Sequence, residues 1–253
     1  MIGRSIGLGE VIALVSGKGG TGKTSVCAGI AAALAEEGKQ VLCIDCDVGL
    51  RNLDISLGMS ECGALSFLDV SEGGYPLEKA SRHPEYPAIA FLTAPLTRSA
   101  EQIDAAAFAA MLRRAKQAFD YVLLDAPAGL DAGFRLAAAS AGRILLVTGS
   151  GPAAVRDAAR VGDILELMGK NDVRLVVNRV DRDMLSAVRQ TIDDVMDNAG
   201  LPLTGIVPED PNVVLAATFG HSVLQYAARC PAAKAYRRIA LRLRGYSVPM
   251  MKK

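Results

Sequence analysis

Residues 17–24 read GKGGTGKT, and this stretch predicts the fold of the chain around it. It fits a pattern in which a glycine, four further residues and then Gly-Lys-Ser/Thr form a phosphate-binding loop. The apolar run VIALVS precedes it at residues 11–16, and an alanine-rich helical pattern follows from Ser25. A strand, a glycine-rich loop and a helix in this order predict that the loop binds phosphate.

The residue types in the loop suit a triphosphate. Phosphate oxygens need many hydrogen-bond donors, and glycines let backbone N–H groups curl around them at the positive end of a helix. Lys23 is expected to neutralise the β and γ phosphates, and Thr24 to offer its hydroxyl to Mg²⁺. A glycine-rich turn without a ligand is the alternative, but such a turn has no use for Lys23 followed by Thr24. The expected nucleotide contacts are Gly17, Lys18, Gly19, Gly20, Thr21, Gly22, Lys23, Thr24 and Ser25.

Apolar runs rich in β-branched residues alternate with helical patterns along the whole chain. The runs lie at 11–16, 41–45, 89–94, 121–125, 144–148, 175–178 and 203–207, and the helical patterns at 25–37, 100–118, 153–168 and 184–199. This alternation predicts an α/β fold with one doubly wound, mainly parallel sheet and helices on both faces. Without a linker or repeat, the 253 residues are expected to form a single domain, 1–253, that buries roughly three quarters of its unfolded surface.

Polar residues stand where the predicted strands end, which is where ligands bind in parallel sheets. Asp125 ends the run YVLLD and is expected to hold Mg²⁺ through a water, with capping of a helix as the alternative. Asp45 and Asp47 end another run, VLCIDCD. Asp45 is a second candidate for the metal shell, although either of these two carboxylates could instead cap a turn.

Composition excludes several classes of protein. The net charge of +1 argues against a chain that coats nucleic acid, because such binding needs many cations. The N-terminal stretch has no apolar core with a cleavage site, and no apolar run is long enough to span a membrane, so a cytoplasmic protein is expected. The five cysteines lack a disulfide spacing, and Cys43 and Cys46 lie along a predicted strand, so packed, reduced thiols are expected.

The loop and four further segments resemble the MinD/ParA family of ATPases. The segments are DCDVGLRNLD at 45–54, DAPAGL at 125–130, AVRDAARVGDIL at 154–165 and GIVPED at 205–210. The resemblance covers nearly the whole chain, weakens at 60–100 and fails at the extreme C-terminus. It implies that the chain binds ATP with Mg²⁺ and forms a homodimer with ATP. In the family an additional loop lysine, here Lys18, crosses to the nucleotide of the partner subunit; a solvated loop lysine is the alternative.

The resemblance also implies roles for residues outside the loop. Segment 45–54 corresponds to the family's first switch, in which Asp47 would orient the attacking water, completing a catalytic set with Lys18 and Lys23. Segment 125–130 corresponds to the second switch. The residues implied at the switches and the dimer joint are Arg51, Asn52, Pro127 and Gly129, and those implied at the purine base are Asn178, Arg179, Pro208, Glu209 and Asp210.

The implied base is adenine, although no residue excludes guanine by its chemistry alone. The guanine-reading N-K-x-D pattern is absent, because Arg179 follows Asn178.

The segments at 45–54 and 154–165 resemble the MinD branch of the family most. This branch implies a slow ATPase in spatial regulation of the division site, with a division inhibitor and an ATPase-stimulating protein as partners. A ParA-type partitioning ATPase that binds DNA non-specifically is the alternative, as is a flagellar-number regulator, which the lack of an N-terminal extension disfavours. An iron–sulfur electron-transfer ATPase would need thiolates in segment 125–130 or a C-terminal CxxC, and the sequence has neither.

The C-terminal stretch 229–253 is basic and carries no acid. Such a patch can meet anionic lipid or nucleic-acid phosphates, and we expect weak, salt-sensitive contact with the inner face of the membrane, with DNA the less favoured partner. The cations are Arg229, Lys234, Arg237, Arg238, Arg242, Arg244, Lys252 and Lys253.

Two parts of this stretch have different expected roles. The apolar stripe of Tyr236, Ile239, Ala240 and Leu243 predicts a helix packed on the sheet. The short basic tail 245–253 follows, and its residues free to insert into a membrane are expected to be Tyr246, Val248, Met250 and Met251.

Overall fold

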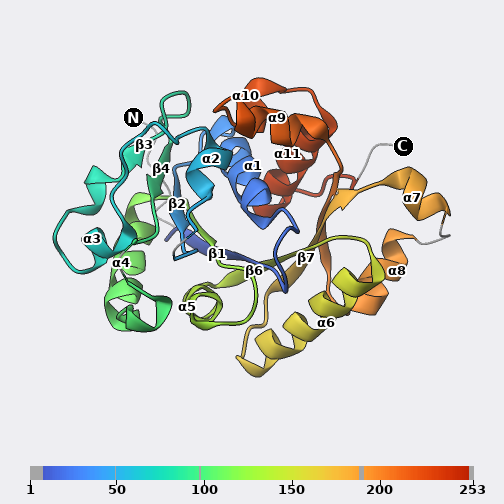
Figure 1. Ribbon diagram of the computed structural model, residues 1–253, viewed down its shortest axis with the longest axis horizontal. Helices are drawn as coiled ribbons and strands as arrows, with labels where there is room; N and C mark the ends of the chain where they lie inside the picture. Colours follow the sequence, from blue (N-terminus) through green and yellow to red (C-terminus); the bar gives the residue numbers. More distant parts are fainter. Residues whose placement is uncertain (1–7, 49, 97, 188–190, 251–253) are drawn as a thin grey trace.

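The computed structural model describes residues 8–48, 50–96, 98–187 and 191–250. Residues 1–7, Gly49 of the first switch segment, and Met251, Lys252 and Lys253 of the tail therefore lie outside the described residues. The strands form one eight-stranded sheet in the order β3-β4-β2-β5-β1-β6-β7-β8 (Figure 1). Only β3 is antiparallel to its neighbour among the described strands. The predicted fold class, one mainly parallel α/β sheet, is confirmed.

The strands of the sheet agree with the apolar runs of the sequence within a few residues. They are β1 Glu10–Val15, β2 Val41–Asp45, β3 Ser81–Arg82, β4 Ile89–Leu92, β5 Tyr121–Asp125, β6 Arg143–Thr148, β7 Val173–Val180 and β8 Leu203–Pro208. The two-residue edge strand β3 was not predicted, because it is too short to leave an apolar run.

Helices cover both faces of the sheet. The apolar residues of α1, α2, α9, α10 and α11 pack in one core, and those of α3, α4, α5, α6 and α8 in a second core on the other face (Figure 1). The helices are α1 Lys23–Glu36, α2 Leu53–Leu57, α3 Phe67–Ser71, α4 Ala105–Ala118, α5 Ala132–Ser140, α6 Pro152–Leu167, α7 Arg182–Ala187, α8 Ile192–Ala199, α9 Pro211–Thr218, α10 Val223–Tyr226 and α11 Pro231–Leu243, with short 3₁₀ turns at Leu77–Lys79 and Ala100–Gln102.

The central strands are apolar throughout because both of their faces are buried. In β1, Ile12 and Leu14 pack in the core beneath α1, whereas Val11, Ala13 and Val15 pack in the core on the opposite face. Successive side chains of a strand point to opposite faces, so each face of β1 needs its own apolar residues.

Two predicted helices are divided by capping side chains. The helix expected over 100–118 begins only at Ala105, because Asp104 accepts hydrogen bonds from the N–H groups of Ala106 and Ala107. The single helix expected over 184–199 is wrong. It is two helices, and Thr191 starts the second with a capping box to Asp194.

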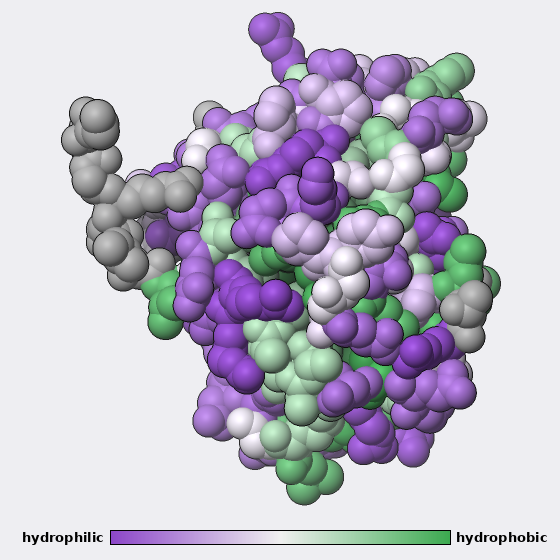
Figure 2. All heavy atoms as spheres, turned by 90° about the vertical axis from the view of Figure 1, so that its left-hand side faces the viewer, coloured by the Kyte–Doolittle hydropathy of each residue, from purple (hydrophilic) through white to green (hydrophobic). Residues whose placement is uncertain are grey.

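Hydrophilic side chains occupy much of the side formed by β3, α3 and α4, with smaller hydrophobic areas between them (Figure 2). Polar cover of this kind discourages a sheet edge from pairing with another chain. None of the helices in the described part of the chain is long and apolar enough to span a bilayer.

Candidate functional site

The phosphate loop joins β1 to α1 at the carboxyl end of the sheet. Gly20 and Gly22 have φ angles of 80° and 81°, in the left-handed region that favours glycine. Gly22 has a second reason to be glycine, because a Cβ there would lie 2.2 Å from Nδ2 of Asn178. The loop leads into α1 at Lys23, where unpaired N–H groups and the helix dipole favour an anion.

Lys23 and Asp125 form a buried ion pair at the end of the loop. The Lys23 Nζ lies 2.6 Å from Oδ1 of Asp125, and the two side chains are 7% and 2% exposed. Burial lowers the pKa of Lys23, but the charge and hydrogen bond of Asp125 outweigh this effect, so the pKa is raised and the ammonium stays charged. The structure thus brings together the predicted phosphate-binding lysine and a predicted metal ligand.

Asp45 lies beside Asp125, because the two residues are register partners at the ends of β2 and β5. Its Oδ1 accepts a hydrogen bond from the N–H of Asp47 at 2.9 Å, and its Oδ2 accepts from Asn52 and Leu53, each at 3.1 Å. Burial and the Asp125 charge raise its pKa to about 6 despite these bonds. Asp45 therefore accepts the N–H groups of Asp47, Asn52 and Leu53 in the chain after β2, as the turn-capping alternative expects. Its contact with a metal stays a prediction.

The oxygen groups around Lys23 fit Mg²⁺. Thr24 follows Lys23 in the first turn of α1, and the carboxylates of Asp45 and Asp125 are both 1% exposed. Two buried carboxylates share one buried cation, so a divalent ion would offset the repulsion that raises the pKa of Asp45. The ligands expected around Mg²⁺ are the Thr24 hydroxyl and carboxylates that act through water. Such a site differs from a cluster of three or more His, Cys, Asp or Glu side chains that binds a metal directly, and the described residues contain no such cluster.

Asp47 lies half-buried next to this cluster. Burial raises its pKa, the charge of Lys23 lowers it, and that of Asp125 raises it, with burial the largest effect and a raised pKa as the result. Its N–H is held by Asp45, so its backbone position is fixed. A carboxylate with a raised pKa is a better proton acceptor, which suits the predicted role towards water.

Two predicted residues of the first switch segment, Arg51 and Asn52, have different partners. Arg51 has a φ of 42°, in the left-handed region, and its Nε donates to Oγ1 of Thr93 at 2.7 Å. The N–H of Asn52 donates to Asp45. Arg51 is therefore directed towards the end of β4, and its place at a dimer joint stays a prediction.

The second switch segment lies against the start of the phosphate loop. Gly129 has a φ of 91°, and its N–H donates to the carbonyl of Ser16 at 3.2 Å. Pro127 packs against Gly133, where a Cβ would approach the Pro127 ring to 2.6 Å. The segment therefore contacts the end of β1 directly before the loop, and its role as a switch stays a prediction.

Lys18 lies at the rim of the loop with its side chain 50% exposed. Its Nζ is 3.9 Å from Oδ2 of Asp157 on α6, and a Cβ at the neighbouring Gly17 would fit tightly, 3.1 Å from Val161 and 3.2 Å from Asp157. An exposed ion pair at this distance contributes little, so Lys18 can leave Asp157 at small cost.

The base-side residues meet the phosphate loop from β7 and β8. Asn178 is buried, and its Nδ2 donates to the carbonyl of Thr21 at 2.8 Å. Arg179 forms a two-bond pair with Glu209 at 2.8 and 3.2 Å. Pro208, the last residue of β8, directly precedes Glu209. Asn178 and Arg179 thus contact the loop directly, and Glu209 contacts it through Arg179. The contact of all these residues with a base stays a prediction.

Asp210, the fifth predicted base contact, has a structural role in this fold. Its Oδ1 accepts from the N–H and side-chain amide of Asn212, and its Oδ2 accepts from the N–H of Ala232 at 3.0 Å. Burial raises its pKa, but these hydrogen bonds outweigh burial and leave the pKa lowered. Asp210 therefore caps α9 and ties it to the start of α11.

Thr93 contacts Arg51 of the first switch segment, and His83 contacts the end of α2. The sequence assigned no role to either residue. Nε2 of the buried His83 lies 2.8 Å from the carbonyl of Leu57, and its Nδ1 accepts from the N–H groups of Glu85 and Tyr86. The strand-end rule that selected Asp45 would also have selected Thr93. His83 carries no local signal, because its partner is the last residue of α2.

The cysteines behave as packing residues, as predicted. Cys27, Cys43 and Cys46 are buried and unpaired, and burial raises the pKa of each thiol. Cys230 caps α11 by accepting the N–H of Ala233. Protonated, buried thiols do not suit an iron–sulfur cluster at a subunit joint.

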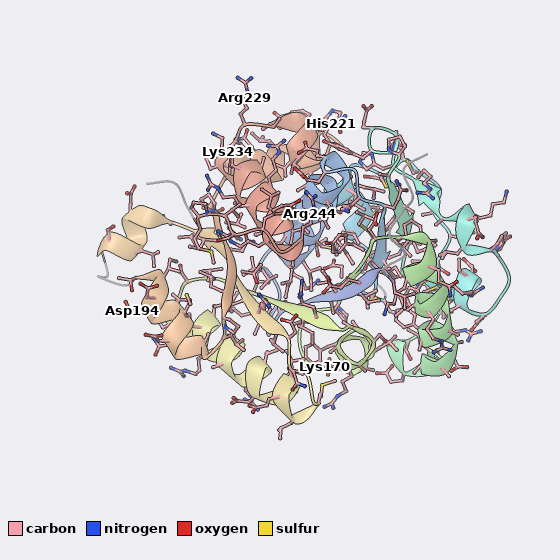
Figure 3. All side chains as sticks on the ribbon, turned by 180° about the vertical axis from the view of Figure 1, so that it is seen from behind. Lys170, Asp194, His221, Arg229, Lys234 and Arg244 are labelled. Carbon is pink, nitrogen blue, oxygen red and sulfur yellow. The ribbon has the colours of Figure 1, made fainter. Side chains whose placement is uncertain are left out.

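The basic C-terminal stretch is neutralised in part by α1. Arg237 pairs with Glu36 through two bonds at 2.6 and 2.8 Å, and Arg244 pairs with Glu37. The stretch has no acid in its own sequence, but acids lie beside it in the fold. They come from a segment about 200 residues earlier in the chain, so the expectation of a basic patch without acidic neighbours is wrong. By contrast, Arg229 extends away from the molecule (Figure 3).

The tail after α11 lies across the edge of the sheet. Arg242 donates to the carbonyl of Thr204 in β8 at 2.9 Å and to that of Val248 in the tail at 2.8 Å. Met250 packs on the core of the opposite face of the sheet. The expectation that Met250 is free to insert into a membrane is therefore wrong, whereas Tyr246 is exposed. The backbone of Val248 is held by Arg242, and the insertion of its side chain stays a prediction. The predicted helix packed on the sheet is confirmed as α11, whose apolar stripe is buried.

Comparison with known proteins identifies the family of the chain. A family model, the CobQ/CobB/MinD/ParA nucleotide binding domain, matches residues 12–223. The septum site-determining protein MinD of Synechocystis sp. is 35% identical over 246 residues, covering 96% of this chain and 92% of that protein.

Solved structures give the same result. A chain from the MinC:MinD cell division protein complex of Aquifex aeolicus is 35% identical with a TM-score of 0.88, covering 96% of this chain and 98% of that chain. MinD from Pyrococcus horikoshii, complexed with Mg-ADP, is 28% identical with a TM-score of 0.81, covering 93% of this chain and 96% of that chain. The motif, the sheet and these relatives agree, and the chain belongs to the CobQ/CobB/MinD/ParA family of nucleotide-binding proteins.

Proposed function

We propose that this protein is a MinD-like ATPase that dimerises with ATP, hydrolyses it slowly and acts in spatial regulation of the division site. The Lys23–Asp125 pair at the end of the glycine loop carries the proposal, because it joins a phosphate-binding cation to a metal-binding carboxylate in one buried site. The septum site-determining relatives support the cellular role.

The chemistry follows from positioning and charge. Lys23 exchanges Asp125 for the β and γ phosphates, and Asp47 orients the attacking water. Mg²⁺, held by Thr24 and through water by Asp125 and Asp45, neutralises phosphate charge when bound. Lys18 leaves Asp157 and supplies a second cation to the partner subunit's nucleotide, since a cation delivered in this way accelerates phosphoryl transfer.

The partners follow from the relatives and the surface. The MinC:MinD complex of Aquifex aeolicus supports a division inhibitor as partner, and the family resemblance adds an ATPase-stimulating protein. On α6, Arg156 and Arg160 are exposed beside Asp157 and are suited to contact such partners. We place the protein in the cytoplasm, with weak contact to the anionic inner face of the membrane through Arg229, Lys234 and Arg238, for which the structure shows no acidic partner among the described residues.

Hydrolysis assays with three purified variants test the site. Lys23→Ala should abolish Mg²⁺-dependent ATP hydrolysis, and Asp47→Ala should bind ATP without turnover. Lys79→Ala, at an exposed lysine outside the site, should behave as the wild type. Hydrolysis retained by Lys23→Ala would refute the assignment of the site, and turnover by Asp47→Ala would remove Asp47 from the mechanism.

A further inference from the structure

A phosphate loop has carbonyl groups as well as N–H groups, and both need partners. When the N–H groups turn inwards to a ligand, the carbonyls of the loop turn outwards and need donors from elsewhere in the fold. Asn178 supplies one of these donors, because its Nδ2 lies 2.8 Å from the carbonyl of Thr21. The Asn178 side chain belongs to a residue that is only 4% exposed, so this bond is shielded from water.

The loop and Asn178 fit each other closely. A Cβ at Gly22 would lie 2.2 Å from Nδ2 of Asn178, so the amide occupies the space that any other residue at this position would need. β7 is not the neighbour of β1 in the sheet, since β6 lies between them. The contact therefore spans β6 and joins segments 157 residues apart.

The end of β7 departs from regular strand geometry in a way that adds a second contact. Its pairing with β8 shifts register between Val177 and Val180, and Arg179 has a φ of 56°. In a regular strand, Asn178 and Arg179 would point to opposite faces of the sheet. Here Nη1 of Arg179 lies 3.4 Å from the carbonyl of Gly20. A bulge and a left-handed residue at a strand end commonly redirect side chains beside a functional site.

Glu209 holds the guanidinium in this place. It accepts from Nε and Nη2 of Arg179, and its own N–H donates to the carbonyl of Val180 at 3.1 Å. The chain of contacts therefore runs from β8 through Glu209 and Arg179 to Gly20, in parallel with the direct bond from Asn178 to Thr21.

We propose that Asn178 is a positioning residue that holds the phosphate loop in its phosphate-binding shape, with Arg179 as a weaker second contact. The proposal rests on the proposed function, because it concerns the same nucleotide site. It differs from a role in reading the base alone, since one N–H of the Asn178 amide is already bonded to the loop. A loop shaped before its ligand arrives binds more tightly, because binding does not have to order it.

Affinities for ATP and for inorganic tripolyphosphate, both with Mg²⁺, separate the two roles. Tripolyphosphate has no base, so its affinity reports on the loop alone. Asn178→Ala should weaken both ligands by the same factor, about fivefold to tenfold, the usual effect of one lost neutral hydrogen bond. The matched control is Asn198→Ala, which removes a similar bond, Nδ2 to the carbonyl of Asp194 at 2.7 Å, on the distant helix α8. It should leave both affinities unchanged.

A weaker affinity for ATP with an unchanged affinity for tripolyphosphate would overturn the proposal and leave Asn178 as a base contact. Failure of the wild type to bind either ligand would instead refute the proposed nucleotide site. Amide hydrogen exchange at residues 18–22, measured without ligand, gives a second readout. Asn178→Ala should speed it and Asn198→Ala should not, and unchanged exchange in Asn178→Ala would also overturn the proposal.

Discussion

The phosphate-loop end of the molecule and its C-terminal segment both carry cations, but they hold them differently. Lys23 is buried against one carboxylate at the end of β5, and its purpose can be read from residues 17–24 alone. Arg237 and Arg244 in the C-terminal segment pair with Glu36 and Glu37 on α1. A local motif therefore predicts the role of Lys23, whereas the role of Arg237 and Arg244 depends on acids that are distant in the sequence.

The difference shows which charged residues in a sequence predict a function. Glycines, a lysine and a threonine in fixed order are needed for one chemistry, so their spacing carries the information. A run of arginines without acids carries less, because the fold decides which acids lie opposite.

The largest expected effect is that of Lys18→Ala. If Lys18 acts as a cation delivered to a partner's nucleotide, the rate of ATP hydrolysis should fall by roughly 10³-fold or more although Lys23 remains. Size-exclusion chromatography with a slowly hydrolysed ATP analogue should show a dimer for the wild type and a monomer for Lys18→Ala. Lys79→Ala should keep the dimer. A Lys18→Ala protein that dimerises and hydrolyses normally would leave Lys18 a solvated loop lysine.

Much of the loop end was predictable, and the exceptions have physical causes. The strand ends placed Asp45, Asp125 and Asn178 at one edge of the sheet, as the structure confirms. The capping role of Asp45 was not decided by the sequence, because a carboxylate suits N–H groups and metal ions equally. Asp210 was expected at the base from the family resemblance, and its capping role depends on Ala232, which is distant in the sequence. At the C-terminus, α11 was predicted from its periodicity, but the pairing with α1 was not, since periodicity does not reveal which helices pack together.

Arg242→Ala tests whether the C-terminal segment serves stability. Its guanidinium joins carbonyls of Thr204 in β8 and Val248 in the tail, so its loss leaves both without these donors. We expect the free energy of unfolding to fall by about 1–3 kcal/mol, measured by urea denaturation, with faster proteolysis of residues 245–250. ATP hydrolysis should be unaffected.

Arg238→Ala is the matched control, because Arg238 is on the same helix and has no hydrogen-bond partner among the described residues. Its effect should stay within about 0.5 kcal/mol. Equal stability of wild type and Arg242→Ala would show that the tail does not depend on this contact.

His83, at the end of the sheet opposite the phosphate loop, gives the fold a dependence on pH that the motif does not contain. Burial lowers the pKa of His83, while the bond to Leu57 and the charge of Glu85 raise it in part. Because the folded-state pKa lies below the unfolded value near 6.5, the stability from neutral His83 is present above about pH 6.5 and lost as pH falls through the folded-state pKa. Protonation also turns Nδ1 from the acceptor of two N–H groups into a donor.

We therefore expect the unfolding free energy of the wild type to fall between pH 7.5 and pH 5 relative to that of His83→Gln. The exposed His221 offers the matched control, since His221→Gln should keep the pH dependence of the wild type. Parallel pH profiles for wild type and His83→Gln would show that His83 does not titrate in this range.

The smallest expected effect concerns contact with lipid. Lys234 is exposed on α11 and has no acidic partner among the described residues, whereas Arg237 and Arg244 are paired on the same helix. One cation near an anionic surface contributes about 1 kcal/mol, so Lys234→Ala should weaken binding to anionic vesicles by about fivefold for each subunit that contacts the surface. Sedimentation with phosphatidylglycerol vesicles, with ATP and with ADP, measures this binding, and Lys79→Ala should match the wild type.

Binding to the vesicles should need ATP, because a dimer presents two patches to one surface, and should weaken with salt. Vesicle binding that is absent at low salt, together with DNA binding that falls steeply as salt rises, would favour the DNA-partitioning alternative over the membrane contact.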